Sequence, residues 1–254
     1  MPIKKYITHE FEGLAKVQEL IDTLHGGDCL RGVLHISDYQ VPKAMAIRIT
    51  NQVKLHGGAL KTVQHWSEVN QCDMTFNIYL PEDNIRLQRN KGYPVLYFLS
   101  GLTCNQQNFV EKSGFAKYAR EHKIAVVVCD TSPRNTDLAE ANEHKWEAQP
   151  YANWCVGYGA GHYVDATAEP WNKHFNMYSY VTKELPQIVN EYFPVDPASK
   201  SIFGHSMGGN GALVVALRNA KEYRSVSAFA PLSAPLTSAL SAEALRLYLQ
   251  GPDW

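Results

Sequence analysis

The sequence GHSMGG, from Gly204 to Gly209, places a serine between glycines in a pattern that could do nucleophilic chemistry. The pattern G-x-S-x-G is typical of a sharp strand-to-helix turn that lifts a serine above the edge of a sheet. Glycine suits positions 204 and 208 because such a turn is strained and a Cβ atom would collide with neighbouring chains. The preceding run KSIF predicts a strand and the following GALVVALRNA predicts a helix. Ser206 is therefore the candidate nucleophile.

A nucleophilic serine needs donors for the oxyanion that forms when it attacks an acyl carbon. The N–H of Met207 lies at the start of the predicted helix, where the helix dipole is positive. The second donor usually comes from the loop after an earlier strand. The segment YFLSGLTC ends a predicted strand at Leu99 and continues into a turn of small residues, so we expect the N–H of Leu102 to be that donor. The alternative is that Ser100-Gly101 only turns the chain.

The elements that would position these groups follow from the pattern between Cys72 and Trp254. The alternating run MTFNIYL predicts a half-buried strand, and the apolar runs PVLYFL, AVVV, SIF and SVSAFAP predict buried strands. Two segments with helical spacing, 105–122 and 176–193, lie between them. This alternation predicts an α/β fold with a mostly parallel sheet and helices on both faces. Before it, KVQELIDTLHGGDCLRGVLHI predicts a helix that ends at Gly26-Gly27, followed by a strand.

Composition excludes several classes of function. The 254 residues carry a net charge of −1, which gives no basic surface for nucleic acid and no attraction to anionic membranes. No apolar run approaches the ~20 residues of a membrane span, and the N-terminus lacks the apolar core of a signal peptide. The five cysteines are scattered and form no C-x-x-C pair. We therefore expect reduced thiols in a cytoplasmic protein.

Several segments together carry a family resemblance. SGLTCNQQNF, DTSPR, GYGAGHYVDAT, SIFGHSMGGNGAL and SVSAFAP, in this order, make the chain from Val53 to Trp254 resemble the S-formylglutathione hydrolases, the esterase D family of α/β-hydrolases. The resemblance implies a thioester hydrolase that releases glutathione and formate, with side activity on simple esters and no metal or organic cofactor. It gives Ser206 the role of nucleophile and Leu102 and Met207 the role of oxyanion donors. The expected partner is a small glutathione thioester, and a homodimer is a further expectation.

The partners that would activate Ser206 are the main departure. The α/β-hydrolases carry their catalytic residues in the order serine, acid, histidine. This sequence has no histidine after Ser206, and its later acids are Glu222, Glu243 and Asp253. The resemblance implies that the family's acid and histidine lie in a C-terminal portion beyond EALRLYLQGPDW, so we expect a hydrolase fold without its last strands and helix. Without a histidine, a serine hydroxyl is a weak nucleophile. We do not expect the side chains at 162, 174 and 205, all histidines, to replace it.

The N-terminal part carries a second, shorter resemblance. Ile3 to Ile36 resembles the C-terminal tail of the glutathione-dependent formaldehyde dehydrogenases, but no zinc-ligand cluster or dinucleotide-binding loop accompanies it. The expected organisation is an appended segment at 1–52, with a junction at 37–52, and a truncated hydrolase domain at 53–254. The glycines at 157, 159 and 161 lack the G-x-G-x-x-G spacing and predict a tight turn near the ester site.

Three residues are candidate neighbours of the site. Cys104 follows the expected oxyanion loop, His205 precedes the nucleophile, and Trp171 could line an entrance. Each has a simpler alternative: an inert cysteine, a histidine that points away from Ser206, and a tryptophan packed in the core. Three functions remain open from the sequence: a thioesterase or carboxylesterase, an acyltransferase on the same scaffold, and an inactive truncated remnant.

Overall fold

The computed structural model describes residues 9–12, 32–35, 46–82, 92–134, 136, 138 and 155–249, which belong to two compact units, Met1–Ala46 and Ile47–Trp254. In the first unit, β1 (His9–Glu12) and β2 (Gly32–His35) pair in parallel. The strand expected after Gly26-Gly27 coincides with β2. The helix expected before it lies outside the described residues, as does most of the segment that resembles the dehydrogenase tail.

The second unit is built on a seven-stranded sheet with the order β3-β4-β5-β7-β6-β8-β9. The strands are β3 (Ile47–Leu55), β4 (Gly58–Ser67), β5 (Cys72–Leu80), β6 (Tyr93–Leu99), β7 (Ala125–Cys129), β8 (Val195–His205) and β9 (Val226–Phe229). The pairs β3–β4, β4–β5 and β5–β7 are antiparallel, whereas β7–β6, β6–β8 and β8–β9 are parallel. The expected α/β class is confirmed, and the strands β7, β6, β8 and β9 pair in parallel as expected; the antiparallel strands β3, β4 and β5 make the sheet mixed.

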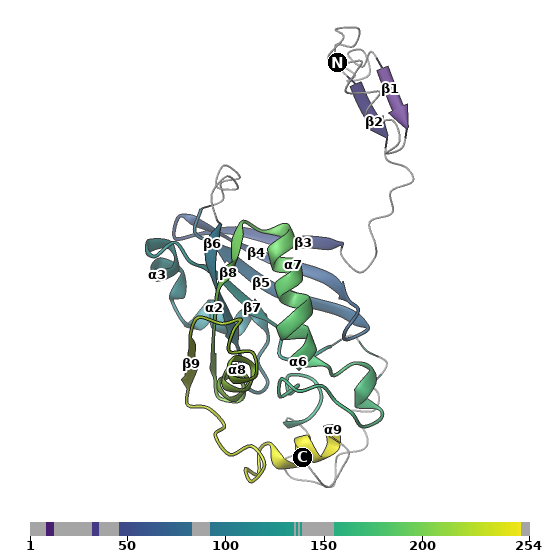
Figure 1. Ribbon diagram of the computed structural model, residues 1–254, viewed down its shortest axis with the longest axis vertical. Helices are drawn as coiled ribbons and strands as arrows, with labels where there is room; N and C mark the ends of the chain where they lie inside the picture. Colours follow the sequence, from purple (N-terminus) through teal and green to yellow (C-terminus); the bar gives the residue numbers. More distant parts are fainter. Residues whose placement is uncertain are drawn as a thin grey trace. The chain divides into compact units, whose positions relative to one another are not determined.

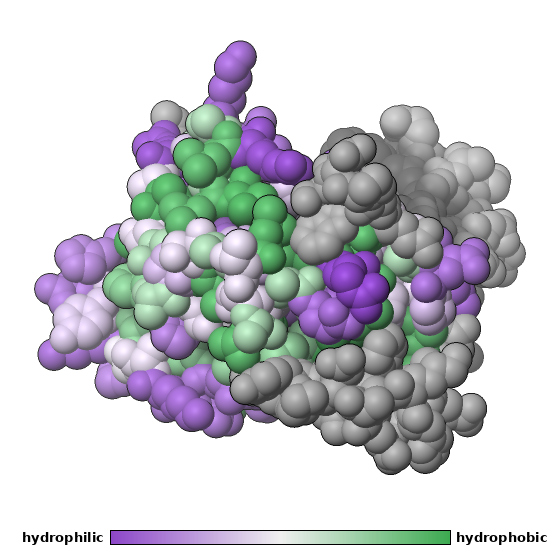
Figure 2. Space-filling view, turned by 90° about the horizontal axis from the view of Figure 1, so that it is seen from below, coloured by the Kyte–Doolittle hydropathy of each residue, from purple (hydrophilic) through white to green (hydrophobic). Residues whose placement is uncertain are grey.

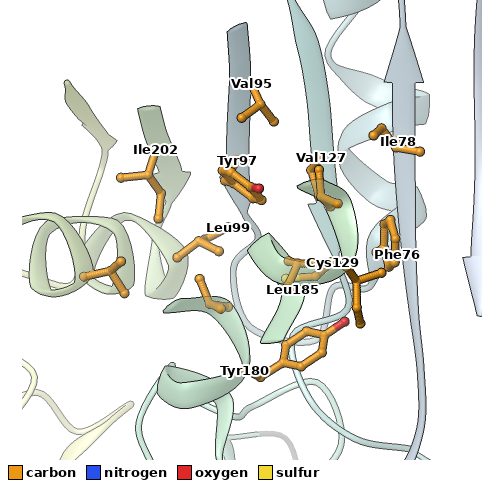
Figure 3. Packing of buried hydrophobic residues seen from close by; sticks show 14 of the residues in the cluster. Phe76, Ile78, Val95, Tyr97, Leu99, Val127, Cys129, Tyr180, Leu185 and Ile202 are labelled. Carbon is orange, nitrogen blue, oxygen red and sulfur yellow. The ribbon is translucent and has the colours of Figure 1, made fainter. Parts of the chain in front are cut away.

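The period-2 alternation of the strands produces two separate apolar cores. On β6, Val95, Tyr97 and Leu99 face one core, whereas Leu96 and Phe98 face the other. The strand β7 divides in the same way. Figure 3 shows the first and larger core, in which side chains of β5, β6, β7 and β8 meet Tyr180 and Leu185. Such strands are apolar on both faces, which explains why the runs PVLYFL and AVVV are continuous rather than alternating.

Helices lie on both sides of the sheet, as expected (Figure 1). The first core is covered by α6 (Met177–Ser179), a π-helical turn (Tyr180–Glu184), α7 (Leu185–Tyr192) and α8 (Met207–Arg218). The second is covered by α2 (Gln106–Lys112) and α3 (Phe115–Glu121). The sequence predicted one helix over 105–122. Two form instead, because Gly114 takes a left-handed φ of 63° between them. A short 3-10 turn (Trp171–Lys173) and α9 (Ala242–Tyr248) complete the described helices.

The antiparallel pair β3–β4 was missed by the sequence analysis. Its strands are joined at His56 and Gly57, which both have positive φ (45° and 77°), the geometry of a two-residue type I′ hairpin turn. Most residues of β3 are exposed on both faces, so the strand has no apolar alternation that could have revealed it. The pair His-Gly between two strand-like runs was the only local signal.

The expected division at 52/53 falls inside β3, which begins at Ile47. The assignment of an appended segment and a hydrolase domain stays a prediction. Within the part of the chain that is described, no helix has the length and apolarity required to cross a membrane.

We expect removal of the hydroxyl group from two buried tyrosines to change the free energy of unfolding differently. Tyr97 is 2% exposed, and its hydroxyl has no hydrogen-bond partner among the described residues. Tyr163 donates to the carbonyl of Ser100 at 2.9 Å. Tyr97→Phe should therefore leave the free energy of unfolding unchanged or raise it, whereas Tyr163→Phe should lower it by about 1 kcal/mol. Urea unfolding followed by circular dichroism measures both, and equal losses in the two variants would contradict the assignment.

Candidate active site

Ser206 lies at the junction of β8 and α8, with φ 57° and ψ −119°. Positive φ is a strained conformation for a serine, and it persists only where the surrounding structure enforces it. The N–H of Ser206 donates to the carbonyl of Phe229 at 2.9 Å, and its own carbonyl accepts from Asn210 and Leu232. The predicted strand-to-helix turn is confirmed. The role of Ser206 as nucleophile stays a prediction.

Two glycines permit this turn because the chains on either side come very close. A Cβ atom on Gly204 would lie 2.1 Å from the carbonyl oxygen of Gly208. A Cβ atom on Gly208 would lie 2.0 Å from the carbonyl oxygen of Leu99, at the end of β6. Contacts this short do not occur between real atoms, so any other residue at either position would displace backbone. This close approach also brings the elbow against the loop that follows β6.

That loop faces Ser206. A Cβ atom built on Gly101 would lie 3.2 Å from the Cβ of Ser206, so the backbone at 101–102 runs directly beside the serine. Among the described residues, neither the N–H of Leu102 nor that of Met207 has a hydrogen-bond partner. Two unoccupied donors on either side of a serine are what an oxyanion requires. The arrangement supports the predicted roles of Leu102 and Met207 but does not test them.

Neighbouring segments fix the loop after β6 through its own backbone. The N–H of Thr103 donates to the carbonyl of Gly159 at 2.8 Å, and a Cβ atom on Gly159 would lie 2.9 Å from the Cα of Thr103. The carbonyl of Cys104 accepts from Thr131 Oγ1 at 2.5 Å and from Arg134 Nη2 at 3.1 Å. The turn expected around residues 157–161 therefore lies against the loop after β6, beside the candidate site.

Arg134 is itself fixed by Asp130. Its Nε donates to Asp130 Oδ2 at 2.8 Å and its Nη2 to Oδ1 at 3.1 Å. Burial raises the pKa of the Asp130 carboxyl, although the bonds from Arg134 oppose that shift. The sequence analysis did not predict these contacts of Arg134 and Thr131, because a loop segment such as DTSPR has no periodicity from which its contacts could be inferred.

Tyr163 connects this loop to the helix that follows the serine. Its hydroxyl donates to the carbonyl of Ser100, and its ring lies so close to α8 that a Cβ atom on Gly211 would be 2.5 Å from a ring carbon. The residue is fully buried and has a positive φ of 54°. Sequence reasoning did not single out Tyr163, and the only signal was the third glycine of α8, which a nucleophile elbow does not require.

A cavity of about 570 Å³ opens beside the elbow. Cys104 and His205 line it together with Ser100 and Gly101, so the structure brings these two candidate neighbours to the site. Trp171 is not among the lining residues. It is 2% exposed and packs against Phe175 and Tyr248, with ring centroids 4.9 and 5.1 Å away. These contacts favour the core-packing alternative for Trp171.

No histidine in the described chain is hydrogen-bonded to Ser206. Three are buried and engaged elsewhere: His65 with Tyr180 Oη, His162 with the carbonyl of Cys155, and His174 with the carbonyl of Asn70. Burial lowers the pKa of His65 and His162, which keeps both rings neutral. His205 is exposed and borders the cavity, but no hydrogen bond joins it to the serine.

The later carboxylates are also engaged away from the elbow. Glu222 pairs with Lys200 at 2.8 Å, and Glu243 pairs with Arg246 at 2.7 Å. Asp253 lies outside the described residues. The described chain thus contains a serine, two candidate oxyanion donors and a fixed loop, but no acid–histidine pair to activate the serine. The expectations that no metal and no cofactor are needed stay predictions.

Comparison with known proteins agrees with this geometry. Residues 67–250 match the family model described as "Putative esterase". The S-formylglutathione hydrolase of Mus musculus is 46% identical over 210 residues, which cover 82% of this chain and 69% of the mouse protein. That of Bos taurus is 47% identical over 205 residues, with coverage of 81% and 68%. The chain belongs to the S-formylglutathione hydrolase family.

The fold agrees with that membership. The solved structure of the S-formylglutathione hydrolase from Agrobacterium tumefaciens superposes with a TM-score of 0.72 at 43% identity, covering 81% of this chain and 69% of the other. A serine hydrolase of Staphylococcus aureus, at 22% identity and a TM-score of 0.51, shares the fold alone. The predicted α/β-hydrolase class is therefore confirmed for this S-formylglutathione hydrolase family member.

Substitution of Gly208 should disrupt the elbow. We expect Gly208→Ala to lower the free energy of unfolding by about 3 kcal/mol or more, because its Cβ atom meets the backbone of Leu99. The matched control is Gly114→Ala: nothing lies within 4 Å of its Cβ position, and only the positive φ opposes it. That control should cost about 1 kcal/mol. Equal losses in urea unfolding would show that the close approach at Gly208 does not exist.

The buried histidines predict a dependence of stability on pH. Because the folded state keeps His65 and His162 neutral below their ordinary pKa of 6.5, the unfolded chain binds more protons there. The free energy of unfolding should therefore decrease as the pH falls from about 6.5 toward the lower pKa values of the folded state. Urea titrations at a series of pH values measure this decrease.

Substitution of an exposed histidine is the control for this decrease in stability at low pH. His162→Gln should make the decrease shallower, whereas His122→Gln, at an exposed position, should leave it unchanged. If the free energy of unfolding depends on pH in the same way in the unsubstituted protein and in His162→Gln, then His162 does not contribute to the decrease.

Proposed function

We propose that this protein hydrolyses S-formylglutathione to glutathione and formate through an acylated serine, Ser206. The observation that carries the proposal is the position of Ser206 at a strained strand-to-helix turn, beside the loop at 101–102. Membership of the S-formylglutathione hydrolase family supports the choice of a thioester as substrate. Simple carboxylic esters are expected as side substrates because they pass through the same kind of tetrahedral intermediate.

The proposed chemistry follows from the donors around the serine. Ser206 Oγ attacks the formyl carbon, and the charge that develops on the acyl oxygen is stabilised by the N–H groups of Leu102 and Met207. The carbon–sulfur bond then breaks, and glutathione leaves with the proton that Ser206 has lost. In the second half, water attacks the formyl ester of Ser206 and releases formate. The contacts of Thr131, Arg134 and Tyr163 with the loop after β6 hold one donor in place throughout.

Both halves need a base. Attack by Ser206 and attack by water each require a proton acceptor, and no described histidine is hydrogen-bonded to the serine. In this proposal the described residues provide the nucleophile and the oxyanion donors, and none of the described histidines serves as the general base. The proposed site therefore has the geometry of a serine hydrolase, with a serine that no described histidine activates.

We also propose a cytoplasmic location. The four described cysteines, Cys72, Cys104, Cys129 and Cys155, are all free thiols, and burial raises the pKa of Cys72 and Cys129 to about 12, which keeps both of them protonated. Reduced, inert thiols suit a reducing compartment. Formation of a homodimer stays a prediction that light scattering would test.

The 254-residue chain should hydrolyse S-formylglutathione and p-nitrophenyl acetate only weakly. Loss of the base should reduce turnover by about 10⁴ to 10⁶, or about 5 to 8 kcal/mol of barrier, relative to a complete serine hydrolase. Steady-state rates measured with protein checked by intact mass should therefore change little on Ser206→Ala.

Rapid hydrolysis that depends on Ser206 would contradict this expectation. If the chain turns over at ordinary esterase rates and Ser206→Ala abolishes them, a histidine within these 254 residues is the base. His205→Ala would then identify it or leave the buried histidines as candidates.

A further inference from the structure

A polar cavity of about 210 Å³ adjoins the loop that follows β6. Its walls come from the start of β5, the start of α2 and the segment that follows β7, and they include Asp73, Gln106, Asp130 and Arg134. Charged and hydrogen-bonding side chains predominate, whereas the cavity beside the elbow is lined largely by aromatic rings. Figure 2 shows one face of the molecule, on which hydrophilic patches likewise lie between apolar ones.

Arg134 has hydrogen-bond donors that the protein does not use. A guanidinium group carries five N–H donors in a rigid fork. Three of them are engaged: Nε donates to Asp130 Oδ2, and Nη2 donates to Asp130 Oδ1 and to the carbonyl of Cys104. Among the described residues, the two N–H groups of Nη1 have no partner, and the side chain is 36% exposed. These two donors can bind a carboxylate from solution.

The same cavity carries a negative charge that no described residue balances. Arg134 neutralises Asp130, but Asp73 is exposed and has neither an ion pair nor a hydrogen bond within the described part of the chain. The side-chain oxygen of Gln106 is buried and also has no hydrogen-bond partner among the described residues. A buried acceptor without a donor is unfavourable, which indicates that a ligand supplies one. An ammonium group, with three donors and a positive charge, suits both acceptors.

These two requirements together select one kind of chemical group. A simple anion would bind Nη1 of Arg134 but would be repelled by Asp73. A simple cation would bind Asp73 but would leave the donors of Arg134 without a partner. The headgroup of an α-amino acid carries an ammonium and a carboxylate on one carbon atom, so it satisfies both sides of the cavity.

One compound with such a headgroup can reach from this cavity to Ser206. Asp130 directly follows β7 and Ser206 directly follows β8, and β6 lies between these two strands. Two strand spacings amount to roughly 10 Å. In glutathione, the α-amino nitrogen of the γ-glutamyl residue is eight bonds from the sulfur, a reach of roughly 10 Å in an extended chain. A thioester carbon at Ser206 therefore leaves the γ-glutamyl headgroup within reach of the end of β7.

We propose that this cavity binds the γ-glutamyl headgroup of a glutathione thioester. Its carboxylate binds Nη1 of Arg134, and its ammonium binds Asp73 and the side-chain oxygen of Gln106. The choice of glutathione rests on the proposed function, whereas binding of an α-amino-acid headgroup rests on the cavity alone. Asp73 is thus a specificity residue for glutathione thioesters and has no contact with simple esters such as p-nitrophenyl acetate.

Binding of an unreactive analogue tests the cavity without any chemistry. The probe is S-methylglutathione, a thioether, titrated into the chain by isothermal calorimetry. We expect saturable binding that Asp73→Asn weakens about fivefold, because the lost charge pair is partly exposed to water. Glu121→Gln is the matched control and should leave binding unchanged. Glu121 is an exposed carboxylate at the end of α3, shortly before β7 begins, and so lies at the other end of this strand.

A second probe tests which atom of the ligand Asp73 recognises. The analogue is S-methylglutathione in which a glutaryl group replaces the γ-glutamyl group, so that only the α-amino group is missing. We expect it to bind about fivefold more weakly than S-methylglutathione, and Asp73→Asn should not weaken it further. Equal weakening of both ligands by Asp73→Asn would contradict contact between Asp73 and the ammonium.

Other results would overturn the proposal as a whole or in its choice of ligand. An absence of saturable binding up to about 10 mM S-methylglutathione would overturn it, as would equal effects of Asp73→Asn and Glu121→Gln. Free glutamate distinguishes the two sources of the headgroup. If glutamate binds as tightly as S-methylglutathione, the cavity is a site for a free amino acid, and the assignment to a glutathione thioester is wrong.

Labelling of Ser206 by a fluorophosphonate separates this site from the proposed function. S-methylglutathione should slow the labelling, and a higher concentration should be needed in Asp73→Asn. Binding that depends on Asp73 but leaves the labelling rate unchanged would show that cavity and elbow do not share one substrate, which contradicts the proposal. If Ser206 is labelled but binding does not depend on Asp73, only the site is wrong. If binding depends on Asp73 but Ser206 is not labelled, the amino-acid site stands and the proposed function is wrong.

Discussion

The close approach of the turn between β8 and α8 to the end of β6 is the constraint on which the rest of the site depends. The backbones of Gly204, Gly208 and Leu99 leave no room for a Cβ atom on either glycine. This contact fixes the direction in which α8 leaves the sheet and gives Ser206 its positive φ. It also places the loop at 100–102 beside the serine, so a single packing contact positions the candidate nucleophile and both candidate donors.

Further hydrogen bonds fix the loop after β6 in this position. Tyr163 joins the carbonyl of Ser100 to α8, and the Asp130–Arg134 pair holds the carbonyl of Cys104. These groups are buried or half-buried, where a hydrogen bond lost on one side leaves the other polar group unsatisfied. The loop is therefore fixed before any substrate arrives, as electrostatic stabilisation of an oxyanion requires. Among the described residues, no histidine is hydrogen-bonded to Ser206.

The sequence predicted those elements best whose residue pattern follows directly from burial or from steric crowding. The apolar runs at β6 and β7 and the glycines around Ser206 follow from burial and from crowding, and the structure bears out both. The exposed strand β3 has no apolar alternation and was missed. The contacts of Tyr163, Thr131 and Arg134 join segments far apart in the chain, so no local pattern could predict them. The antiparallel pairing of β5 with β7 was also not predicted, because apolar runs reveal burial but not strand direction.

The central claim is that Ser206 is a positioned nucleophile without a histidine base. The most direct measurement is the rate at which a fluorophosphonate labels Ser206 as a function of pH, read by mass spectrometry of the peptide that contains it. A serine without a base reacts through its small ionised fraction, so the logarithm of the rate should rise steadily with pH from about 5.5 to 9. A rate that levels off above about pH 7, as the titration of a histidine near its ordinary pKa of about 6.5 would produce, contradicts the account.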